Sequence, residues 1–177
     1  MITHKIRAYV VLIALRKFLN KQMKVLDIGC GSGIITNLIE KRFKCDILGV
    51  DVLDYADDIN FKKISDPYKL PFNNNAFDRG LLIDTLHHIE NQEKAILEAL
   101  RVCKKVFIFD IEPGFWAWFI DNILNLLTNK EMNNSFNNRT VKGWIKLFEK
   151  MNIKYTKVNF NKPLWYPLPQ FCFRLEK

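Results

Sequence analysis

The sequence has few cysteines and none in a metal-binding pattern. Its four cysteines form no CxxC pair, and they stand at Cys30, Cys45, Cys103 and Cys172. Their spacing fits neither a zinc site nor a disulfide framework. We therefore predict that the protein uses no metal. Because reduced cysteines are typical of the cytosol, we also expect a cytoplasmic location.

Long apolar runs are absent too. The longest apolar run near the N-terminus, Ala8 to Leu15, is bounded by Arg7 and Arg16. It is shorter than the roughly 18 residues that a membrane-spanning helix needs. No small-residue cleavage site follows it, so we expect neither a spanning helix nor a signal peptide.

What is present is the composition of an ordinary globular domain. The chain has 177 residues, of which 49% are hydrophobic and 26% are charged. This length predicts one domain, and this hydrophobic fraction excludes wholesale disorder. The net charge of +8 is open to several interpretations. It could attract nucleic acid, an anionic membrane surface or an acidic substrate, or it could simply reflect a sequence rich in lysine.

Strand-like and helix-like segments alternate along the chain. Apolar residues recur at helical spacing in four segments, 4–22, 33–43, 91–103 and 141–151, and Thr140 is a good N-cap for the last of them. Short β-rich runs lie between and after them, at 24–28, 45–52, 61–64, 77–84, 106–111, 155–160 and 170–175. This alternation predicts a parallel sheet with helices on both faces. We see no internal repeat and no domain linker.

The most informative segment is Val25-Leu26-Asp27-Ile28-Gly29-Cys30-Gly31-Ser32-Gly33. It leaves a predicted strand, turns on three alternating glycines and enters a predicted helix. Glycines allow the backbone to turn tightly and to approach a ligand closely. The N-terminus of the helix offers free N–H groups to a negative group. Such a unit in an open α/β sheet can hold a nucleotide.

The glycine loop differs from two known nucleotide-binding patterns, and these differences indicate which class of nucleotide it could bind. A dinucleotide-binding fingerprint reads GxGxxG, whereas the third glycine here, Gly33, stands one place early. No Lys-Ser or Lys-Thr follows, which excludes a phosphate-binding P-loop. Asp27 precedes the first glycine by two residues. A carboxylate at that point would repel a pyrophosphate, but it suits a ligand that ends in a positive ammonium group.

With these residues in place, VLDIGCGSG resembles motif I of the class I S-adenosylmethionine-dependent methyltransferases. Later segments match that family in order and spacing: Leu48-Gly49-Val50-Asp51-Val52, Ser65-Asp66-Pro67-Tyr68, Phe77-Asp78 and Asp84-Thr85-Leu86-His87-His88-Ile89. The resemblance runs from about Lys24 to the C-terminus and is closest to the small UbiE-like, or type 11, group. It implies a three-layer Rossmann-like α/β sandwich with a seven-stranded, mostly parallel sheet whose last strand is antiparallel.

The resemblance also implies a cofactor, S-adenosyl-L-methionine, and residues that hold it. Asp51 would bind the ribose hydroxyls, Asp66 would contact the adenine amino group, and Asp27 with the glycine loop would hold the methionine end. The expected cofactor-binding residues are Asp27, Gly29, Cys30, Gly31, Gly33, Asp51, Val52, Asp66, Pro67 and Asp84. For Cys30 we expect the backbone N–H, rather than the thiol, to face the cofactor.

The methyl acceptor is expected on the other half of the sheet. Asp84, Thr85 and His88 are the candidate catalytic residues, as groups that orient the substrate or as a general base. Methyl transfer from a sulfonium needs no dedicated base, because positioning and desolvation can provide most of the rate. The expected substrate-side residues are Tyr9, His87, Phe115, Trp116 and Phe119.

Within the single domain, 1–177, two segments lie outside the expected methyltransferase core, and we expect them to determine which acceptor binds. These are a lid helix in 1–23 and a substrate-side insertion, 113–139, which opens with an aromatic helix at 115–127. An apolar, aromatic-lined roof would suit a lipid-like or aromatic small molecule. The N-terminal helix is also a candidate for peripheral membrane contact.

Two further functions remain open. An RNA or protein methyltransferase would explain the charge of +8, but the basic residues form no dense run and no RNA-binding module is attached. The tetrapeptide Asn/Asp-Pro-Pro-Tyr is absent after the fourth strand, which argues against methylation of DNA adenine. A non-catalytic S-adenosylmethionine-binding subunit ranks last, because Asp27 and the glycine loop are intact.

Overall fold

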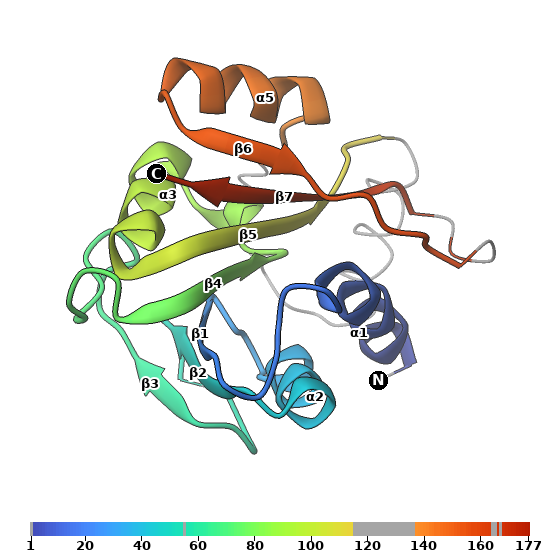
Figure 1. The fold of residues 1–177 in the computed structure, drawn as a ribbon, viewed down its shortest axis with the longest axis vertical. Coiled ribbons are helices and arrows are strands. Elements are labelled where there is room, and N and C mark those ends of the chain that lie inside the picture. The colour runs from blue at the N-terminus through green and yellow to red at the C-terminus, as the bar shows by residue number, and fades with distance from the viewer. Residues whose placement is uncertain (1, 55, 115–136, 164–165, 167) are drawn as a thin grey trace.

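The computed structural model describes residues 2–54, 56–114, 137–163, 166 and 168–177. Within these residues a seven-stranded sheet has the order β3-β2-β1-β4-β5-β7-β6, with helices on both sides (Figure 1). The elements are α1 (Ile2–Leu15), β1 (Lys24–Ile28), α2 (Ile34–Phe43), β2 (Asp46–Asp51), β3 (Phe61–Lys63), β4 (Phe77–Ile83), the short 3₁₀ helix η1 (Leu86–His88), α3 (Gln92–Val102), β5 (Cys103–Ile111), α5 (Val141–Lys150), β6 (Lys154–Lys157) and β7 (Gln170–Glu176).

The strand order creates a crevice in the middle of the sheet. β1 lies between β2 and β4 and pairs with both in parallel. After β1 the chain first builds β2 and β3 on one side and then returns to place β4 and β5 on the other. Ligands of open α/β sheets bind at such a switch point, outside the carboxyl ends of the strands. The fold therefore predicts a ligand-binding site at the carboxyl ends of β1, β2 and β4.

Strand residues point alternately to the two faces of the sheet and pack into two hydrophobic cores, one on each face. Leu26, Leu82 and Ile108 belong to the core beneath α3 and α5, whereas Val25 and Phe107 belong to the core beneath α1 and α2. Both faces are covered, so the central strands are almost continuously apolar, as parallel strands in α/β proteins usually are. Together these layers form a three-layer sandwich.

The last two strands confirm the expected change of direction. β7 is antiparallel to both β5 and β6, whereas all the other neighbouring strands pair in parallel. The predicted fold class, a Rossmann-like sandwich with an antiparallel last strand, is confirmed. The predicted cap of α5 is confirmed too, because the hydroxyl of Thr140 accepts a hydrogen bond from the amide of Gly143 at 3.1 Å.

Three element boundaries differ from the predicted ones by three or more residues. α1 ends at Leu15 rather than near residue 22, because the chain turns there and carries Phe18 onto Phe107, with ring centroids 5.1 Å apart. Apolar residues therefore continue past the end of the helix and prolong its sequence pattern. β5 begins three residues earlier than predicted, directly after α3, and β6 ends earlier, at Lys157. The predicted aromatic helix, 115–127, lies outside the described residues.

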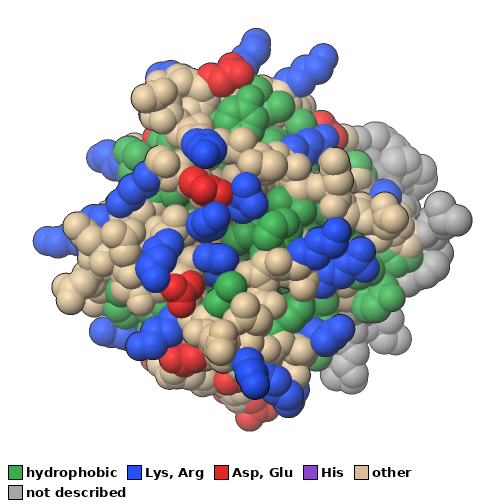
Figure 2. All heavy atoms as spheres, viewed as in Figure 1, with side chains coloured by type: hydrophobic (Ala, Val, Ile, Leu, Met, Phe, Trp, Pro, Cys, Tyr) green, Lys and Arg blue, Asp and Glu red, His purple; other side chains and the backbone are tan. Residues whose placement is uncertain are grey.

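Basic side chains are dispersed over the face of the molecule that Figure 2 shows. Figure 2 shows lysine and arginine side chains scattered over the face seen in Figure 1, with acidic, polar and apolar side chains between them. Several basic residues are used in ion pairs, such as Lys104 with Asp78 and Lys150 with Glu93. The visible face therefore carries no continuous basic stripe of the kind that tracks a nucleic-acid backbone.

Candidate functional site

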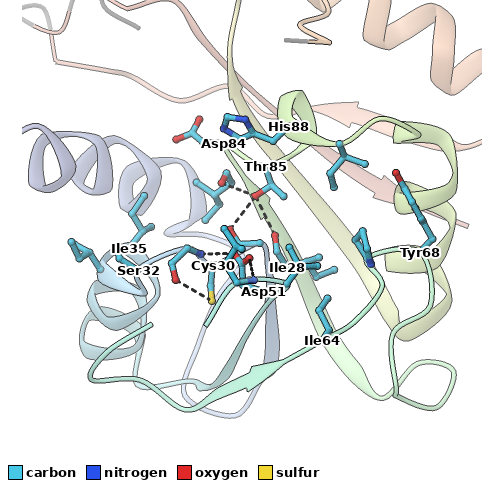
Figure 3. Close-up of a pocket in the computed structure, with 18 of the residues that line it drawn as sticks. Ile28, Cys30, Ser32, Ile35, Asp51, Ile64, Tyr68, Asp84, Thr85 and His88 are labelled. Atoms are coloured by element: carbon cyan, nitrogen blue, oxygen red, sulfur yellow. Dashed lines mark hydrogen bonds between the residues drawn. The ribbon is translucent and has the colours of Figure 1, made fainter. Parts of the chain in front are cut away.

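A cavity of about 680 Å³ opens at the carboxyl ends of β1, β2 and β4. This is the size range of small-molecule and cofactor sites. In Figure 3, Asp51 lies in the middle of the lining residues, with Tyr68 and Ile64 to one side and Asp84 and His88 to another. The lining is formed by Arg7, Ile28, Gly29, Cys30, Gly31, Ser32, Ile34, Ile35, Asp51, Val52, Leu53, Ile64, Pro67, Tyr68, Ile83, Asp84, Thr85, His88, Ile89 and Glu90.

The glycine loop adopts a backbone that other residues tolerate poorly. Gly29, Gly31 and Gly33 all have positive φ, at +76°, +56° and +77°. A Cβ atom on Gly29 would lie 2.3 Å from Cγ2 of Thr85, so that position has no room for a side chain. The hydroxyl of Thr85 lies within hydrogen-bonding distance of the carbonyl oxygens of Ile28 and Gly29, at 3.2 and 3.3 Å. The end of β4 therefore fixes the shape of the loop.

Asp51 ties the end of β2 to the same loop. Its carboxylate accepts hydrogen bonds from the amides of Gly31 and Leu53, at 2.9 and 3.0 Å. The side chain is mostly buried, yet it lines the cavity. The next residue, Val52, also lines the cavity and is 42% exposed. Asp51 is thus a carboxylate held in one orientation beside a cavity, which suits the recognition of hydroxyl groups.

Asp27 lies beneath the loop rather than in the cavity wall. It is buried, and one of its oxygens accepts a hydrogen bond of 2.6 Å from the hydroxyl of Thr36. Burial raises the pKa of Asp27 to about 6, with the Thr36 hydrogen bond opposing this shift and the charge of Asp51 adding to it. Sequence reasoning missed Thr36, although a hydroxyl residue near the start of the helix that follows a glycine loop is a signal that could have found it.

The loop after β3 brings three of its residues to the cavity. Ile64, Pro67 and Tyr68 line it, whereas Asp66 is not part of the lining. Asp66 instead accepts a hydrogen bond from the amide of Tyr68 at 2.7 Å, which fixes the turn. The hydroxyl of Tyr68 accepts a hydrogen bond from the amide of Asn91 at 3.1 Å. Sequence reasoning did not single out Tyr68.

Asp84 forms the most unusual contact of the site. It has a positive φ of +52°, and both of its carboxylate oxygens accept hydrogen bonds from Arg7 of α1. The guanidinium of Arg7 lies over the ring of Phe109, 4.8 Å from its centroid. Burial raises the pKa of Asp84, and the charge and hydrogen bonds of Arg7 oppose that shift. Arg7 is a site residue that sequence reasoning missed, because nothing near it in the chain resembles a motif.

The two histidines of η1 have different surroundings. His88 lines the cavity, and burial, reinforced by the neighbouring His87, lowers its pKa to about 4. At neutral pH it is therefore an uncharged imidazole and a weak base. Nδ1 of His87 lies 3.0 Å from a carboxylate oxygen of Asp110 on β5, and His87 itself is not part of the cavity lining.

The remaining predicted residues divide into three groups. Cys30 lines the cavity, and burial, with the charges of Asp27 and Asp51, raises its pKa to about 12, so it is a neutral thiol. Tyr9 is 52% exposed and is not part of the lining. The other predicted substrate-side aromatics, Phe115, Trp116 and Phe119, lie outside the described residues.

The described residues contain neither a metal-binding cluster nor a membrane-spanning helix. Among them, no group of three or more His, Cys, Asp or Glu side chains is arranged to hold a metal ion. In the same part of the chain, no helix is both long enough and apolar enough to cross a membrane.

Known proteins share part of the sequence pattern. Residues 26–109 match the sequence profile of a family described as methyltransferase domain. A sterol 24-C-methyltransferase from Gibberella zeae is 30% identical over 115 residues, which cover 57% of this chain and 29% of that protein. An uncharacterised methyltransferase from Schizosaccharomyces pombe is 30% identical over 107 residues, or 50% of this chain and 38% of that protein. The chain thus spans about a third of the length of these relatives.

Solved structures share the fold over nearly the whole chain. An S-adenosylmethionine-dependent methyltransferase from Thermotoga maritima, described as a possible histamine N-methyltransferase, superposes with a TM-score of 0.70 at 16% identity and covers 99% of this chain and 92% of its own. A protein from Pyrococcus horikoshii superposes with a TM-score of 0.66 at 20% identity, covering 98% and 90%. Residues 26–109 therefore match a methyltransferase-domain family, and the chain shares its fold with a solved S-adenosylmethionine-dependent methyltransferase.

Proposed function

We propose that this protein is an S-adenosylmethionine-dependent methyltransferase that acts on a small-molecule acceptor. One observation carries the proposal. Gly29 and Gly31 of the glycine loop, both with positive φ, and the fixed carboxylate of Asp51 line one cavity, to which the end of β4 also contributes. This arrangement offers backbone groups, a hydroxyl-binding acid and an open side for a second substrate within a single space.

The residues around the cavity fit the parts of this cofactor. The carboxylate of Asp51 would accept hydrogen bonds from the ribose hydroxyls, while Pro67 and Tyr68 would flank the adenine. The glycine loop would hold the methionine end, and the buried charge of Asp27 beneath it would favour the ammonium group. When bound, the cofactor supplies a methyl group on a positively charged sulfur, which is already a good leaving group.

The end of β4 would face the methyl acceptor. Asp84, Thr85 and His88 all line the cavity there. Thr85 is occupied with backbone carbonyls, one of them that of Ile83 at 3.0 Å, so its role would be to fix the loop. His88, with its pKa lowered to about 4, would provide an uncharged wall or a neutral hydrogen-bonding group rather than a strong base.

Two observations favour a small molecule as the acceptor. Much of the cavity lining is apolar, with isoleucines at 28, 34, 35, 64, 83 and 89, as in typical small-ligand sites. One curated relative is a sterol methyltransferase, which supports an apolar acceptor. The RNA alternative gains no support from the visible surface, because its basic side chains are dispersed (Figure 2).

Calorimetric titration with S-adenosylhomocysteine, the demethylated product, tests the proposal. We expect binding by the natural chain and at least tenfold weaker binding by Asp51→Asn, because an amide cannot replace the carboxylate towards two hydroxyls. Asp46→Asn is the matched control, since Asp46 is exposed at the other end of the same strand. An absence of binding at millimolar ligand, or equal losses in both variants, would contradict the proposal.

A further inference from the structure

Arg7 lies outside the segment that matches the methyltransferase family, yet it reaches into the site. The family profile covers residues 26–109, whereas Arg7 belongs to α1. Only 8% of Arg7 is exposed, and the residue lines the cavity. The family resemblance therefore does not account for the residue that binds Asp84.

The contact between Arg7 and Asp84 fixes the carboxylate on two points. Nε of Arg7 donates to one oxygen of Asp84 at 2.6 Å, and Nη2 donates to the other oxygen. The backbone amide of Asp84 is held as well, by the carbonyl of Phe109 at 2.9 Å. A non-glycine residue at positive φ is strained, and such strain persists where the surroundings over-determine it, often at functional sites. Here both the backbone and the side chain of Asp84 are held.

The pair leaves hydrogen-bonding capacity on the cavity side. An ionised carboxylate has about four acceptor positions, and Arg7 takes one on each oxygen. The side chain of Asp84 is still 28% exposed, and it lines the cavity. Burial raises the pKa of Asp84, but both of its oxygens accept hydrogen bonds from a guanidinium that is always charged, and this contact favours the ionised carboxylate. In that form its remaining positions can accept hydrogen bonds but cannot donate them.

We infer that the Arg7–Asp84 pair selects the acceptor: Asp84 accepts a hydrogen bond from the nucleophilic N–H or O–H group of the acceptor, and Arg7 is the residue that positions it. This inference rests on the proposed function and narrows it to acceptors whose reacting atom is a nitrogen or an oxygen that carries a hydrogen. An acceptor that presents a carbon nucleophile, or an oxygen without hydrogen, would meet only a negative charge at this point.

The step balances without a further reactant. The lone pair of the acceptor's nitrogen or oxygen forms the new bond to the methyl carbon, and the carbon–sulfur bond breaks with its electron pair on sulfur. The proton of the acceptor leaves through the carboxylate of Asp84 to water. Arg7 keeps its own proton throughout, because a guanidinium does not deprotonate in proteins.

Fragment binding tests this inference without the natural acceptor. The probes are two matched pairs, phenol with anisole and aniline with N,N-dimethylaniline, whose members differ in whether the heteroatom carries hydrogen. Binding is measured by ligand-observed NMR above pH 7 with S-adenosylhomocysteine saturating the protein. We expect phenol and aniline to bind about tenfold more tightly than their methylated partners, which is the effect of one hydrogen bond to a charged group.

Three variants test whether the Arg7–Asp84 pair causes the preference for probes with an N–H or O–H group. In Arg7→Met/Asp84→Leu, which removes both charges together, the tenfold ratio of affinities between the two members of each pair should fall to about one. In Arg7→Lys, which keeps the charge but loses the two-point contact, it should fall to a few-fold. Arg101→Lys is the matched control, because Arg101 holds Glu98 by the same two-point contact, at 2.8 and 2.7 Å, away from the cavity. Its ratio should stay at about ten.

The outcomes separate this inference from the proposed function. If S-adenosylhomocysteine fails to bind the natural chain, the proposed function itself is wrong. If it binds, but the members of each pair bind equally or none of them binds, only the role of Arg7 and Asp84 is overturned. A ratio that survives in Arg7→Met/Asp84→Leu would overturn it as well.

Discussion

The two halves of the site are built in different ways. In the half at β1 and β2, the contacts join residues close in the chain, since Thr36 binds Asp27 nine positions away and Gly31 binds Asp51 twenty positions away. In the half at β4 and β5, Arg7 binds Asp84 across 77 positions. The first half is a local motif, whereas the second depends on the packing of a helix against the sheet. Under the proposed function, recognition of the cofactor and choice of the acceptor would thus be separated along the chain.

The largest effect is expected where the halves touch, at Gly29. In Gly29→Ala, the new Cβ would meet Thr85 at 2.3 Å with φ at +76°, so we expect a loss of about 4 kcal/mol in the free energy of unfolding from strain and overpacking. Urea unfolding measures it. Gly114→Ala is the control, because a Cβ atom on Gly114 would meet nothing within 4 Å. Equal, small losses in both variants would show that the halves are not in contact there.

The second effect concerns the long-range half alone. Asp84→Ala would leave the buried guanidinium of Arg7 unpaired, and its Nη1 already has no hydrogen-bond partner among the described residues. We expect a loss of about 3 kcal/mol in the free energy of unfolding, at the lower end for a broken buried pair because Asp84 is 28% exposed. In Arg7→Met/Asp84→Leu most of this loss should be regained. A double variant as unstable as Asp84→Ala would contradict this account of the pair.

The third effect is the pH dependence that Asp27 contributes in the local half. Burial raises the pKa of Asp27 to about 6, whereas an unfolded chain has about 3.9. Between these values the folded protein binds more protons than the unfolded one, so Asp27 lowers the free energy of unfolding as pH rises, by about 2 kcal/mol. Urea unfolding from pH 4 to pH 7 gives the free energy of unfolding of the natural chain and of Asp27→Asn. The difference between the two should show this decline, and a difference that does not change with pH would refute it.

The smallest effect is expected from the hydroxyl beneath the loop. Thr36→Val removes the 2.6 Å hydrogen bond to Asp27 with little change in shape, so we expect a loss of about 1 kcal/mol in the free energy of unfolding. The pKa of Asp27, followed by carboxyl carbon NMR, should rise further. Thr156→Val is the control, because Thr156 lies on the edge strand β6. An unchanged pKa in Thr36→Val would show that the hydrogen bond does not hold the carboxylate.

The contrast between the halves also explains how much the sequence could predict. The glycine loop, Asp27 and Asp51 stand in a motif whose order along the chain matches their order in space, and the strand pattern placed them at one edge of a sheet. Asp84 and His88 were found in the same way, from their position after a strand. Arg7 could not be found, since an arginine on an amphipathic helix is usually a solvated residue, and only the packing of α1 shows otherwise.

Burial changed the interpretation of several predicted residues. His88 was a candidate base, but its surroundings lower its pKa to about 4. Asp66 was expected to contact the cofactor, and that role remains a prediction, because its one described side-chain hydrogen bond is to the amide of Tyr68. Residue identity and order do not carry this information, because desolvation and turn geometry depend on the neighbours that folding provides.

The most direct test of the central claim is an amide NMR titration of the natural chain with S-adenosylhomocysteine. We predict saturable shifts at Gly29, Gly31 and Gly33 and at the residues around Asp51, while the amides of the edge strand β6 stay in place. Glycine amides that do not move at millimolar ligand, or shifts confined to residues away from the cavity, would contradict the claim that this loop holds the cofactor.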